Sequence, residues 1–217
     1  GASNPIQGVG HADLVQAHDG SWWAVCLGFR PQTGAHHVMG RETFLAPVAW
    51  NDNSWPVVNG DGTVSLNMDC QTLPQVKVPE KPSKDDFEET KLSDDWNYLC
   101  IPAFKNYSLT EKKGSLRLKA STVSLDEIDS PTFVGRRQQH TDFCATVALD
   151  FSGIKNDSKA GLTTYMTSNY RYDLSVKCVN GKYILSLSYY LGALRHTEEE
   201  VPLSGKDIFL RVEGSND

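Results

Sequence analysis

Short apolar runs separated by turn residues characterise the first seventy residues of the chain. The runs cover residues 22–27, 43–50, 55–58 and 64–68. The segments between them, which are rich in Gly, Asn, Asp and Ser, include residues 18–20, 51–54 and 59–62. These residue types favour tight turns. We therefore expect short β-strands joined by hairpin turns.

Apolar and polar residues alternate in the second half of the chain. Alternation is clearest in residues 115–120, 145–151, 183–189 and 208–212. A period of two is typical of strands with one buried face, so this half is predicted to form antiparallel sheets packed in a sandwich. No helix longer than two turns is predicted, and the fold class is all-β.

A proline-rich segment divides the two halves. Residues 73–84 contain Pro74, Pro79 and Pro82, a composition typical of a semi-extended linker. The predicted domains are therefore residues 1–72 and 85–217, with residues 73–84 as the linker. Each half has few strands for its apolar and aromatic content, so further polypeptide is expected to cover the exposed sheet faces.

Composition excludes several classes of partner. The 217 residues are 39% hydrophobic with a formal net charge of −6, and the basic residues are scattered, so nucleic acid is not an expected partner. No apolar run approaches the roughly 20 residues that span a bilayer. The first residues do not resemble a secretory signal, which indicates either a removed signal or an internal start.

The cysteines and sequons add little chemistry. The five cysteines stand 30 to 44 residues apart, without the spacing of a zinc site, so no metal ligation through sulfur is predicted. Their odd number leaves at least one thiol free or paired outside the chain. Asn106 and Asn156 begin glycosylation sequons, which would matter in a secreted protein.

Four residues near the start of the chain are candidates for a binding site. By themselves, His11 is interpreted as a structural histidine and Arg41 as one partner of an ion pair with a neighbouring acid. Asp13 would share a strand face with His11, and we expect it to accept hydrogen bonds from a turn. Glu42 follows Arg41 directly and so points to the opposite face, which argues against a catalytic pair.

A family resemblance changes the interpretation of His11 and Arg41. The chain contains Gly-His-Ala-Asp at residues 10–13, Trp22-Trp23, and Gly-Arg-Glu-Thr at residues 40–43, in that order. This pattern resembles the last part of the five-bladed propeller of glycoside hydrolase family 43. The resemblance implies that His11 orients or hydrogen-bonds the catalytic base and that Arg41 holds hydroxyls of the terminal sugar.

The second half resembles the concanavalin-like sandwich of β-xylosidases in the same family. The matching segments are Asp85-Asp86-Phe87, Leu92, Trp96, residues 116–118 and the Gly-Arg-Arg-Gln-Gln-His stretch at 135–140. In that stretch Arg137 and Gln139 share one face. They are interpreted as lining the interface with the propeller or the pocket, or else as part of a charged edge strand.

The resemblance also indicates what this chain lacks. The family places its base, its acid and a modulating aspartate in propeller blades that precede the Gly-His-Ala-Asp segment, and its sandwich continues for several strands beyond the equivalent of residues 211–213. No catalytic carboxylate is therefore expected in this chain, which is predicted to be truncated at both ends.

Three hypotheses for function follow. The first is a portion of a secreted, inverting glycosidase that removes terminal xylose or arabinose from plant cell-wall oligosaccharides. Its acid and base carboxylates would lie outside this chain, either on a companion polypeptide or in a part of the same protein that these residues do not include. The second is a non-catalytic, lectin-like carbohydrate-binding protein, and the third is a structural accessory domain. No cofactor is required by any of them, although relatives leave calcium as an option.

Overall fold

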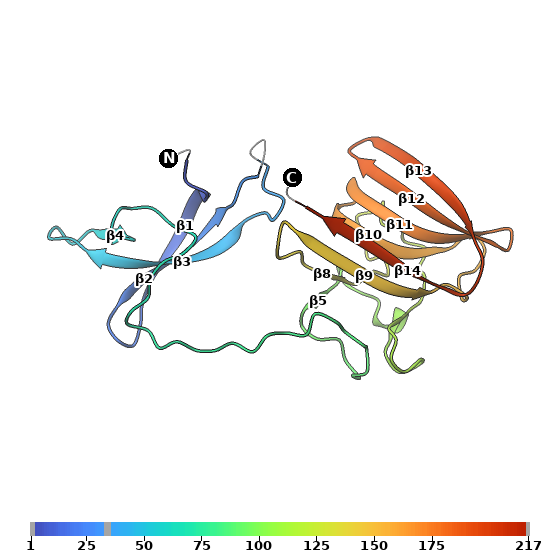
Figure 1. Ribbon diagram of the computed structural model, residues 1–217, viewed down its shortest axis with the longest axis horizontal. Helices are drawn as coiled ribbons and strands as arrows, with labels where there is room; N and C mark the ends of the chain where they lie inside the picture. Colours follow the sequence, from blue (N-terminus) through green and yellow to red (C-terminus); the bar gives the residue numbers. More distant parts are fainter. Residues whose placement is uncertain (1–2, 33–35, 216–217) are drawn as a thin grey trace. The chain divides into compact units, whose positions relative to one another are not determined.

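The computed structural model describes residues 3–32 and 36–215, which divide into two units (Figure 1). The N-terminal unit comprises the residues up to Lys81 together with Gln138–Thr141. The C-terminal unit comprises Pro82–Arg137 and Asp142–Ser215. The division at Lys81 lies within the proline-rich segment.

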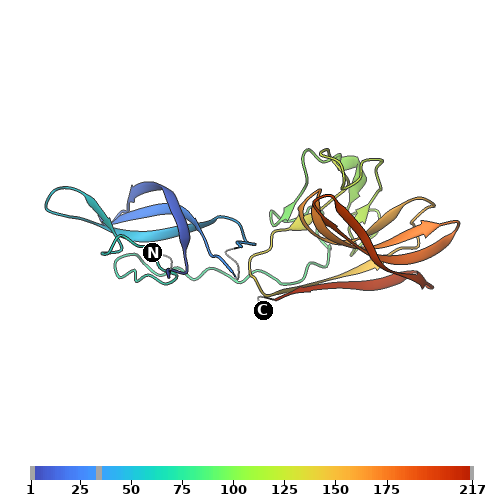
Figure 2. The same ribbon diagram turned by 90° about the horizontal axis from the view of Figure 1, so that it is seen from above.

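The N-terminal unit is built on one four-stranded antiparallel sheet in the order β1-β2-β3-β4 (Figure 2). Its strands are β1 (Gln7–Gln16), β2 (Trp22–Phe29), β3 (Glu42–Trp50) and β4 (Pro56–Val58). Each strand pairs with the next along the chain, which is the meander of a single propeller blade.

Alternation along β2 separates the two faces of this sheet. Cys26 and its neighbours on the same face pack in a core with Ile6, Ala46 and Val64. Val25 and Leu27 point to the opposite face, where Val25 is paired with Leu45 and Leu27 with Thr43. The strand was predicted from its apolar run, and the alternation within it distinguishes the core face from an open face.

Strand β1 is interrupted twice relative to β2. Between Gln7 and Gly10, and again between Gly10 and Asp13, β1 has one residue more than the paired stretch of β2. The extra residues are β-bulges, which bend a strand and redirect its side chains. His11 lies in the second bulge and adopts a left-handed conformation with φ of 51°.

The C-terminal unit contains one four-stranded sheet and three two-stranded sheets. The large sheet has the order β10-β11-β12-β13, with β10 (Lys159–Thr167), β11 (Tyr170–Val179), β12 (Lys182–Leu191) and β13 (Leu194–Leu203). The small sheets pair β14 (Asp207–Gly214) with β9 (Phe143–Asp150), β5 (Trp96–Asn97) with β8 (Gly135–Arg136), and β6 (Tyr107–Ser108) with β7 (Arg117–Leu118). The buried residues Phe151, Val176 and Leu210 come from beside β9, from β11 and from β14. The Phe151 ring lies 5.0 Å from that of Tyr183 on β12, and β14 contacts β10, so the β9–β14 pair packs with the large sheet.

Tight hairpins fix the register of the large sheet. Val179 pairs with Lys182, so only Asn180 and Gly181 connect β11 to β12. Both have positive φ, 49° and 74°. This is the requirement of a type I′ turn, which matches the twist of the strands it joins and favours Asn-Gly.

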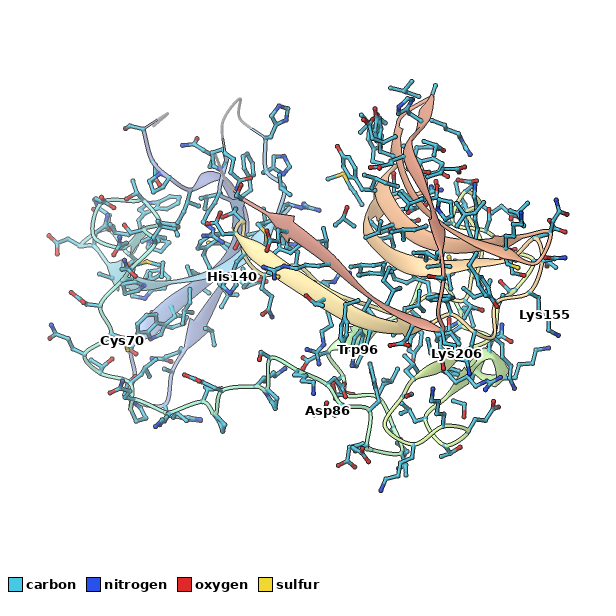
Figure 3. The ribbon with its side chains drawn as sticks, turned by 45° about the vertical axis from the view of Figure 1, so that its right-hand side comes forward. Cys70, Asp86, Trp96, His140, Lys155 and Lys206 are labelled. Carbon is cyan, nitrogen blue, oxygen red and sulfur yellow. The ribbon has the colours of Figure 1, made fainter. Side chains whose placement is uncertain are left out.

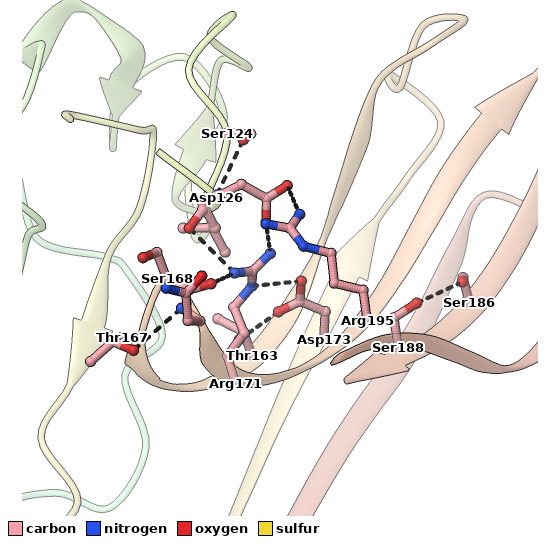
Figure 4. A network of polar contacts seen from close by, with 12 residues as sticks. Ser124, Asp126, Thr163, Thr167, Ser168, Arg171, Asp173, Ser186, Ser188 and Arg195 are labelled. Atoms are coloured by element: carbon pink, nitrogen blue, oxygen red, sulfur yellow. Dashed lines mark hydrogen bonds and ion pairs between the residues drawn. The ribbon is translucent and has the colours of Figure 1, made fainter. Parts of the chain in front are cut away.

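A buried arginine organises polar contacts on one face of the large sheet (Figure 4). The Arg171 Nε–H donates to Asp173 Oδ2 at 3.1 Å, its guanidinium also pairs with Asp126, and it lies 3.5 Å from the Tyr190 ring centroid. Backbone carbonyls of Leu125 and Ser168 accept further hydrogen bonds from it. Arg171 is only 2% exposed, so these partners replace the water that its charge has lost.

Several expected strands differ from the observed ones. Residues 64–68 form no strand, although Val64 is buried in the core, and the predicted strand at residues 115–120 is reduced to Arg117–Leu118. The polar stretch after β8 also leaves the sheet at Arg136. Among the described residues, helix is limited to the 3₁₀ turn η2 (Phe104–Asn106), as expected for an all-β chain.

All five cysteines are described, and none forms a disulfide. Cys26 and Cys178 are buried, whereas Cys70, Cys100 and Cys144 are exposed. Burial raises the pKa of the Cys26 thiol, which keeps it protonated as a small core residue.

In the part of the chain that the structure describes, no helix is long and apolar enough to cross a bilayer.

Candidate functional site

A shallow cleft lies on the open face of the N-terminal sheet. It has a volume of about 350 Å³, and its lining residues come from β1, β2 and the beginning of β3: His11, Asp13, Val25, Cys26, Leu27, Arg41 and Thr43. Because β1 and β3 flank β2, the cleft brings together side chains that are thirty residues apart in the sequence. His11 and Arg41, the two site residues predicted from the sequence, both line it.

The bulge in β1 accounts for the position of His11. Gly10 pairs with Leu27 and Asp13 with Val25, so His11 and Ala12 together occupy the space of one residue on β2. A left-handed backbone is unfavourable for a residue with a Cβ and is concentrated at functional sites. The strand thus departs from regular geometry at the residue that enters the cleft.

Arg41 lies directly before β3 and is exposed. It forms no ion pair with another described residue, whereas its neighbour Glu42 is held by Arg30. The Arg30 Nε–H and Nη2–H groups donate to the two Glu42 oxygens, each at 2.8 Å. The expected partnership of Arg41 with a neighbouring acid is therefore wrong, and its donors remain available on the cleft side.

Glu42 is unsuited to act as a catalytic acid. Its hydrogen bonds with Arg30 lower the pKa of the Glu42 carboxyl below the ordinary value, so the group stays ionised at neutral pH. A general acid in glycoside hydrolysis needs a raised pKa. The prediction that Glu42 does not serve as the acid agrees with this geometry.

Asp13 contributes the only carboxylate among the residues that line the cleft. The hydrogen bonds from a turn that we expected it to accept are not found within residues 3–32 and 36–215. Inverting hydrolysis requires two carboxyl groups roughly 6.5–9.5 Å apart, one protonated and one ionised. The cleft as described presents the side chains of Arg41 and His11 but contains only one of the two carboxyl groups.

Thr43 and Leu27 line the cleft but were not among the predicted site residues. They pair directly across β2 and β3, so the register that places Arg41 at the cleft also places them there. Thr43 belongs to the Gly-Arg-Glu-Thr segment, and its position two residues after Arg41 on a strand was the available signal.

Arg137 and Gln139 are both exposed, and neither lines the cleft described above. Their neighbour Arg136 has a structural role. Its guanidinium pairs with Asp85 at 3.7 Å and lies 4.6 Å from the ring centroid of Trp96, which is labelled in Figure 3. The interdomain or pocket-lining role of Arg137 and Gln139 remains a prediction.

The two sequon asparagines differ in their surroundings. Asn106 is half-buried and its Nδ2 donates to Thr132 Oγ1 at 3.1 Å, so a glycan on this nitrogen would have to fit beside Thr132. Asn156 is exposed and uses its Oδ1 to accept from the Gly181 backbone N–H at 2.8 Å. Asn156 is the better placed acceptor, and glycosylation of either residue remains a prediction.

No group of three or more His, Cys, Asp or Glu side chains is arranged to hold a metal ion within the described ranges. The binding of calcium, which the family resemblance leaves as an option, remains a prediction.

A blade-like sheet with a polar cleft, followed by a β-sandwich, is the domain order of propeller-type glycoside hydrolases. Comparison with protein families agrees with this order: residues 1–56 match the glycosyl hydrolases family 43, and residues 84–217 match the β-xylosidase C-terminal concanavalin A-like domain. The chain therefore belongs to glycoside hydrolase family 43.

Individual relatives are similar over nearly the whole chain. The non-reducing end α-L-arabinofuranosidase BoGH43B of Bacteroides ovatus is 41% identical over 207 residues, which are 94% of this chain and 39% of that protein. A xylosidase/arabinosidase of Butyrivibrio fibrisolvens is 32% identical over 222 residues, covering 100% of this chain and 42% of that protein.

Solved structures give the same match. GH43B of the Bacteroides ovatus xyloglucan PUL has a TM-score of 0.92 at 38% identity, over 99% of this chain and 43% of that one. The xylan β-1,4-xylosidase of Bacillus halodurans has a TM-score of 0.91 at 28% identity, over 99% of this chain and 42% of that one. The chain thus spans about two fifths of the length of these relatives.

Proposed function

We propose that this chain is part of a glycosidase that removes terminal xylose or arabinose from plant cell-wall oligosaccharides by an inverting mechanism. Its own contribution is one wall of the sugar pocket, where Arg41 binds hydroxyls of the terminal sugar and His11 orients the catalytic base. The acid and base carboxylates come from polypeptide outside residues 1–217.

The observation that carries this proposal is the convergence of His11 and Arg41 on one cleft. Arg41 has no ion-pair partner among the described residues, because both carboxylate oxygens of the nearest acid in sequence, Glu42, accept hydrogen bonds from Arg30. An exposed guanidinium with free donors is suited to bind hydroxyl oxygens. The names of the relatives, an α-L-arabinofuranosidase and xylosidases, supply the class of sugar.

Exposed apolar residues beside the cleft support a contribution from further polypeptide. Val15, Val25 and Leu45 lie on the same open face and are 48%, 36% and 47% exposed. On the large sheet of the C-terminal unit, residues that share one face across β11, β12 and β13 are similarly exposed: Tyr170, Tyr172, Leu187, Leu191 and Leu194. Contiguous apolar surface of this kind indicates a buried interface in the complete protein.

Intact mass and turnover, measured together, test the proposal. In the protein isolated from its source, we expect this chain within a longer polypeptide, or with a companion, and that species should hydrolyse nitrophenyl xyloside or nitrophenyl arabinofuranoside. The isolated 217-residue chain should show no turnover. A protein of 217 residues alone in its source, inactive on both substrates, would contradict the proposal and favour the lectin-like or structural alternatives.

Two further parts of the proposal concern conditions rather than the site. Because the substrates are cell-wall oligosaccharides, we propose that the protein is secreted, which cell fractionation would test.

Hydrolysis by two carboxyl groups requires no cofactor. Turnover should therefore survive dialysis against EDTA, and a loss that calcium restores would show a structural or catalytic cation.

A further inference from the structure

The loop that joins β2 to β3 leads directly to Arg41, and two consecutive residues at the end of β2 hold this loop. The Phe29 ring packs against the His37 ring, with centroids 4.4 Å apart and planes at 33°. The Arg30 guanidinium donates two hydrogen bonds of 2.8 Å to Glu42, the first residue of β3. The loop is therefore held across its neck and at a second point within it.

The Arg30–Glu42 pair lies on the face of the N-terminal sheet that is opposite to the cleft. Along β3, Glu42 shares a face with Phe44, which packs against the core cluster. Arg41 and Thr43, one residue to either side of Glu42, line the cleft. Because neighbouring residues of a strand point to opposite faces, holding the Glu42 side chain on the core face directs Arg41 towards the cleft.

Arg41 lies between a tight turn and the first residue of a strand. Gly40 precedes it with φ of 70°, a conformation that glycine adopts more readily than other residues. The Gly40 N–H donates to the His37 carbonyl at 2.9 Å, which closes the turn. The ladder between β2 and β3 begins only at Glu42. Strand ends open more readily than strand interiors, so the position of Arg41 depends on what holds Glu42.

The geometry of the pair is better suited to orientation than to stability. With 37% and 26% of the two side chains accessible, the pair should contribute little to folding. Its two hydrogen bonds nevertheless fix the angle between the guanidinium and the carboxylate, which a single contact would not do. Arg30 is not among the residues that line the cleft. It therefore affects a ligand in the cleft only through its neighbours.

We propose that Arg30 is a positioning residue for sugar binding, which keeps the Arg41 guanidinium directed into the cleft by holding Glu42 on the core face. This inference rests on the proposed function, in which Arg41 binds hydroxyls of the terminal sugar. A displacement of about 1 Å in a group that contacts substrate lowers turnover by up to about a hundredfold. Even a partial loss of orientation should therefore be visible in kcat/KM.

A double-mutant cycle in the complete glycosidase tests this role. Arg30→Met should lower kcat/KM on nitrophenyl xyloside or nitrophenyl arabinofuranoside by about fivefold. Arg30→Lys, which keeps the charge but not the planar fork, should show an intermediate loss. In an Arg41→Ala background, Arg30→Met should cause no further loss, because the residue that it positions is gone. An arginine with a merely structural role would lower kcat/KM equally in both backgrounds.

A second variant and a matched control complete the set. Glu42→Gln removes the same pair from its other side and should lower kcat/KM as Arg30→Met does. Arg117→Met is the control, because Arg117 forms a partly exposed pair with Glu111 at 3.0 Å in the C-terminal unit, and its kcat/KM should match that of the wild type. In NMR spectra of the 217-residue chain, the Arg30 Nε–H should be protected from exchange in Arg41→Ala and lose that protection in Glu42→Gln.

The outcomes separate this inference from the proposed function. A loss of kcat/KM in Arg41→Ala but not in Arg30→Met would overturn the inference and leave the proposed function intact. Equal losses from Arg30→Met in both backgrounds would do the same, because Arg30 would then act independently of Arg41. If Arg41→Ala itself keeps full kcat/KM, the role of Arg41 in the proposed function fails, and the positioning role of Arg30 fails with it.

Discussion

Arg41 and Arg171 show two opposite uses of the same side chain. Arg171 is buried against the large sheet, where Asp126, Asp173, the Tyr190 ring and two carbonyls surround its guanidinium. Arg41 is exposed at a cleft and forms no ion pair with any residue that the structure describes. The first arginine is satisfied by the fold itself, whereas the second retains donors for a ligand.

The two arginines separate a structural role from a candidate binding role. Arg171 has more hydrogen-bond and ion-pair partners than Arg41 and is more deeply buried. Yet each of its partners comes from the protein, so removing it should affect folding first. Functional groups are instead those whose hydrogen-bonding capacity the fold leaves unused.

Replacement of Arg171 should have the largest effect. Arg171→Met keeps an unbranched apolar stem but removes the guanidinium from the buried Asp173 carboxylate, which then has only the Thr163 hydroxyl as a side-chain partner among the described residues, so the free energy of unfolding should fall by about 3–5 kcal/mol. Urea denaturation of the 217-residue chain measures this. Arg195→Met is the control: Arg195 pairs with Asp126 from a half-exposed position and should contribute about 0–1 kcal/mol. Equal losses in the two variants would remove the distinction between the buried and the exposed pair.

Replacement of Arg41 should reverse this pattern. Arg41→Ala should leave the free energy of unfolding of the 217-residue chain within about 0.5 kcal/mol of the wild type. In the complete glycosidase it should lower kcat/KM by about 10- to 150-fold, since it removes charge-assisted hydrogen bonds of about 1.5–3 kcal/mol. A destabilised variant with normal turnover would make Arg41 a structural residue.

The pH dependence of stability should reveal the carboxylate side of the Arg171 network. Burial raises the pKa of Asp126, but hydrogen bonding and charge from Arg171 and Arg195 outweigh it, so the pKa lies below the ordinary value. A lowered pKa contributes stability above the unfolded-state value of about 4, and this is lost as pH falls through the folded-state pKa. Asp126→Asn should therefore cost about 1–2 kcal/mol at pH 7 and flatten the decline in stability below about pH 5. An unchanged slope below that pH would contradict the assignment.

The Arg30–Glu42 pair should give the smallest effect. It is bidentate but partly exposed, with 37% and 26% of the two side chains accessible, so Arg30→Ala should cost about 0.5–1 kcal/mol. Glu42→Gln should cost a similar amount, and the double variant should show little additional loss. Additive losses in a double-mutant cycle would mean that the two side chains stabilise the protein independently.

Apolar runs bounded by turn residues predicted β2 and β3. Regular alternation was enough to predict β9, β12 and β14, because each has one face more buried than the other. It failed for β1, whose two bulges break the period of two, and for β13, whose residues are almost all exposed and largely charged. Residues 64–68 were wrongly assigned to a strand because Val64 is buried from a loop. An apolar residue predicts that its side chain is buried, but it does not predict whether the backbone forms a strand or a loop.

The site was predictable only in part, for a related reason. His11 and Arg41 stand in short motifs that family resemblance makes visible. The Arg171 network joins Asp126 to Arg171 across 45 residues, and the local sequence around either residue does not predict this pairing. The occupation of Glu42 by Arg30 was likewise hidden, because the loop between β2 and β3 separates the two residues. Such pairings depend on tertiary register, which a single sequence does not contain.

The two bulges of β1 make its length as important as its composition. Each extra residue reverses which face the following side chains occupy, and the second reversal cancels the first. Deleting one residue between Gln7 and Gly10 would leave the other bulge uncompensated and turn the chain ahead of it, including Ile6 of the core, away from its packing partners. A single deletion in this strand should thus be far less tolerated than a substitution at the same place, and natural variants of β1 are expected to keep its residue count even where its side chains change.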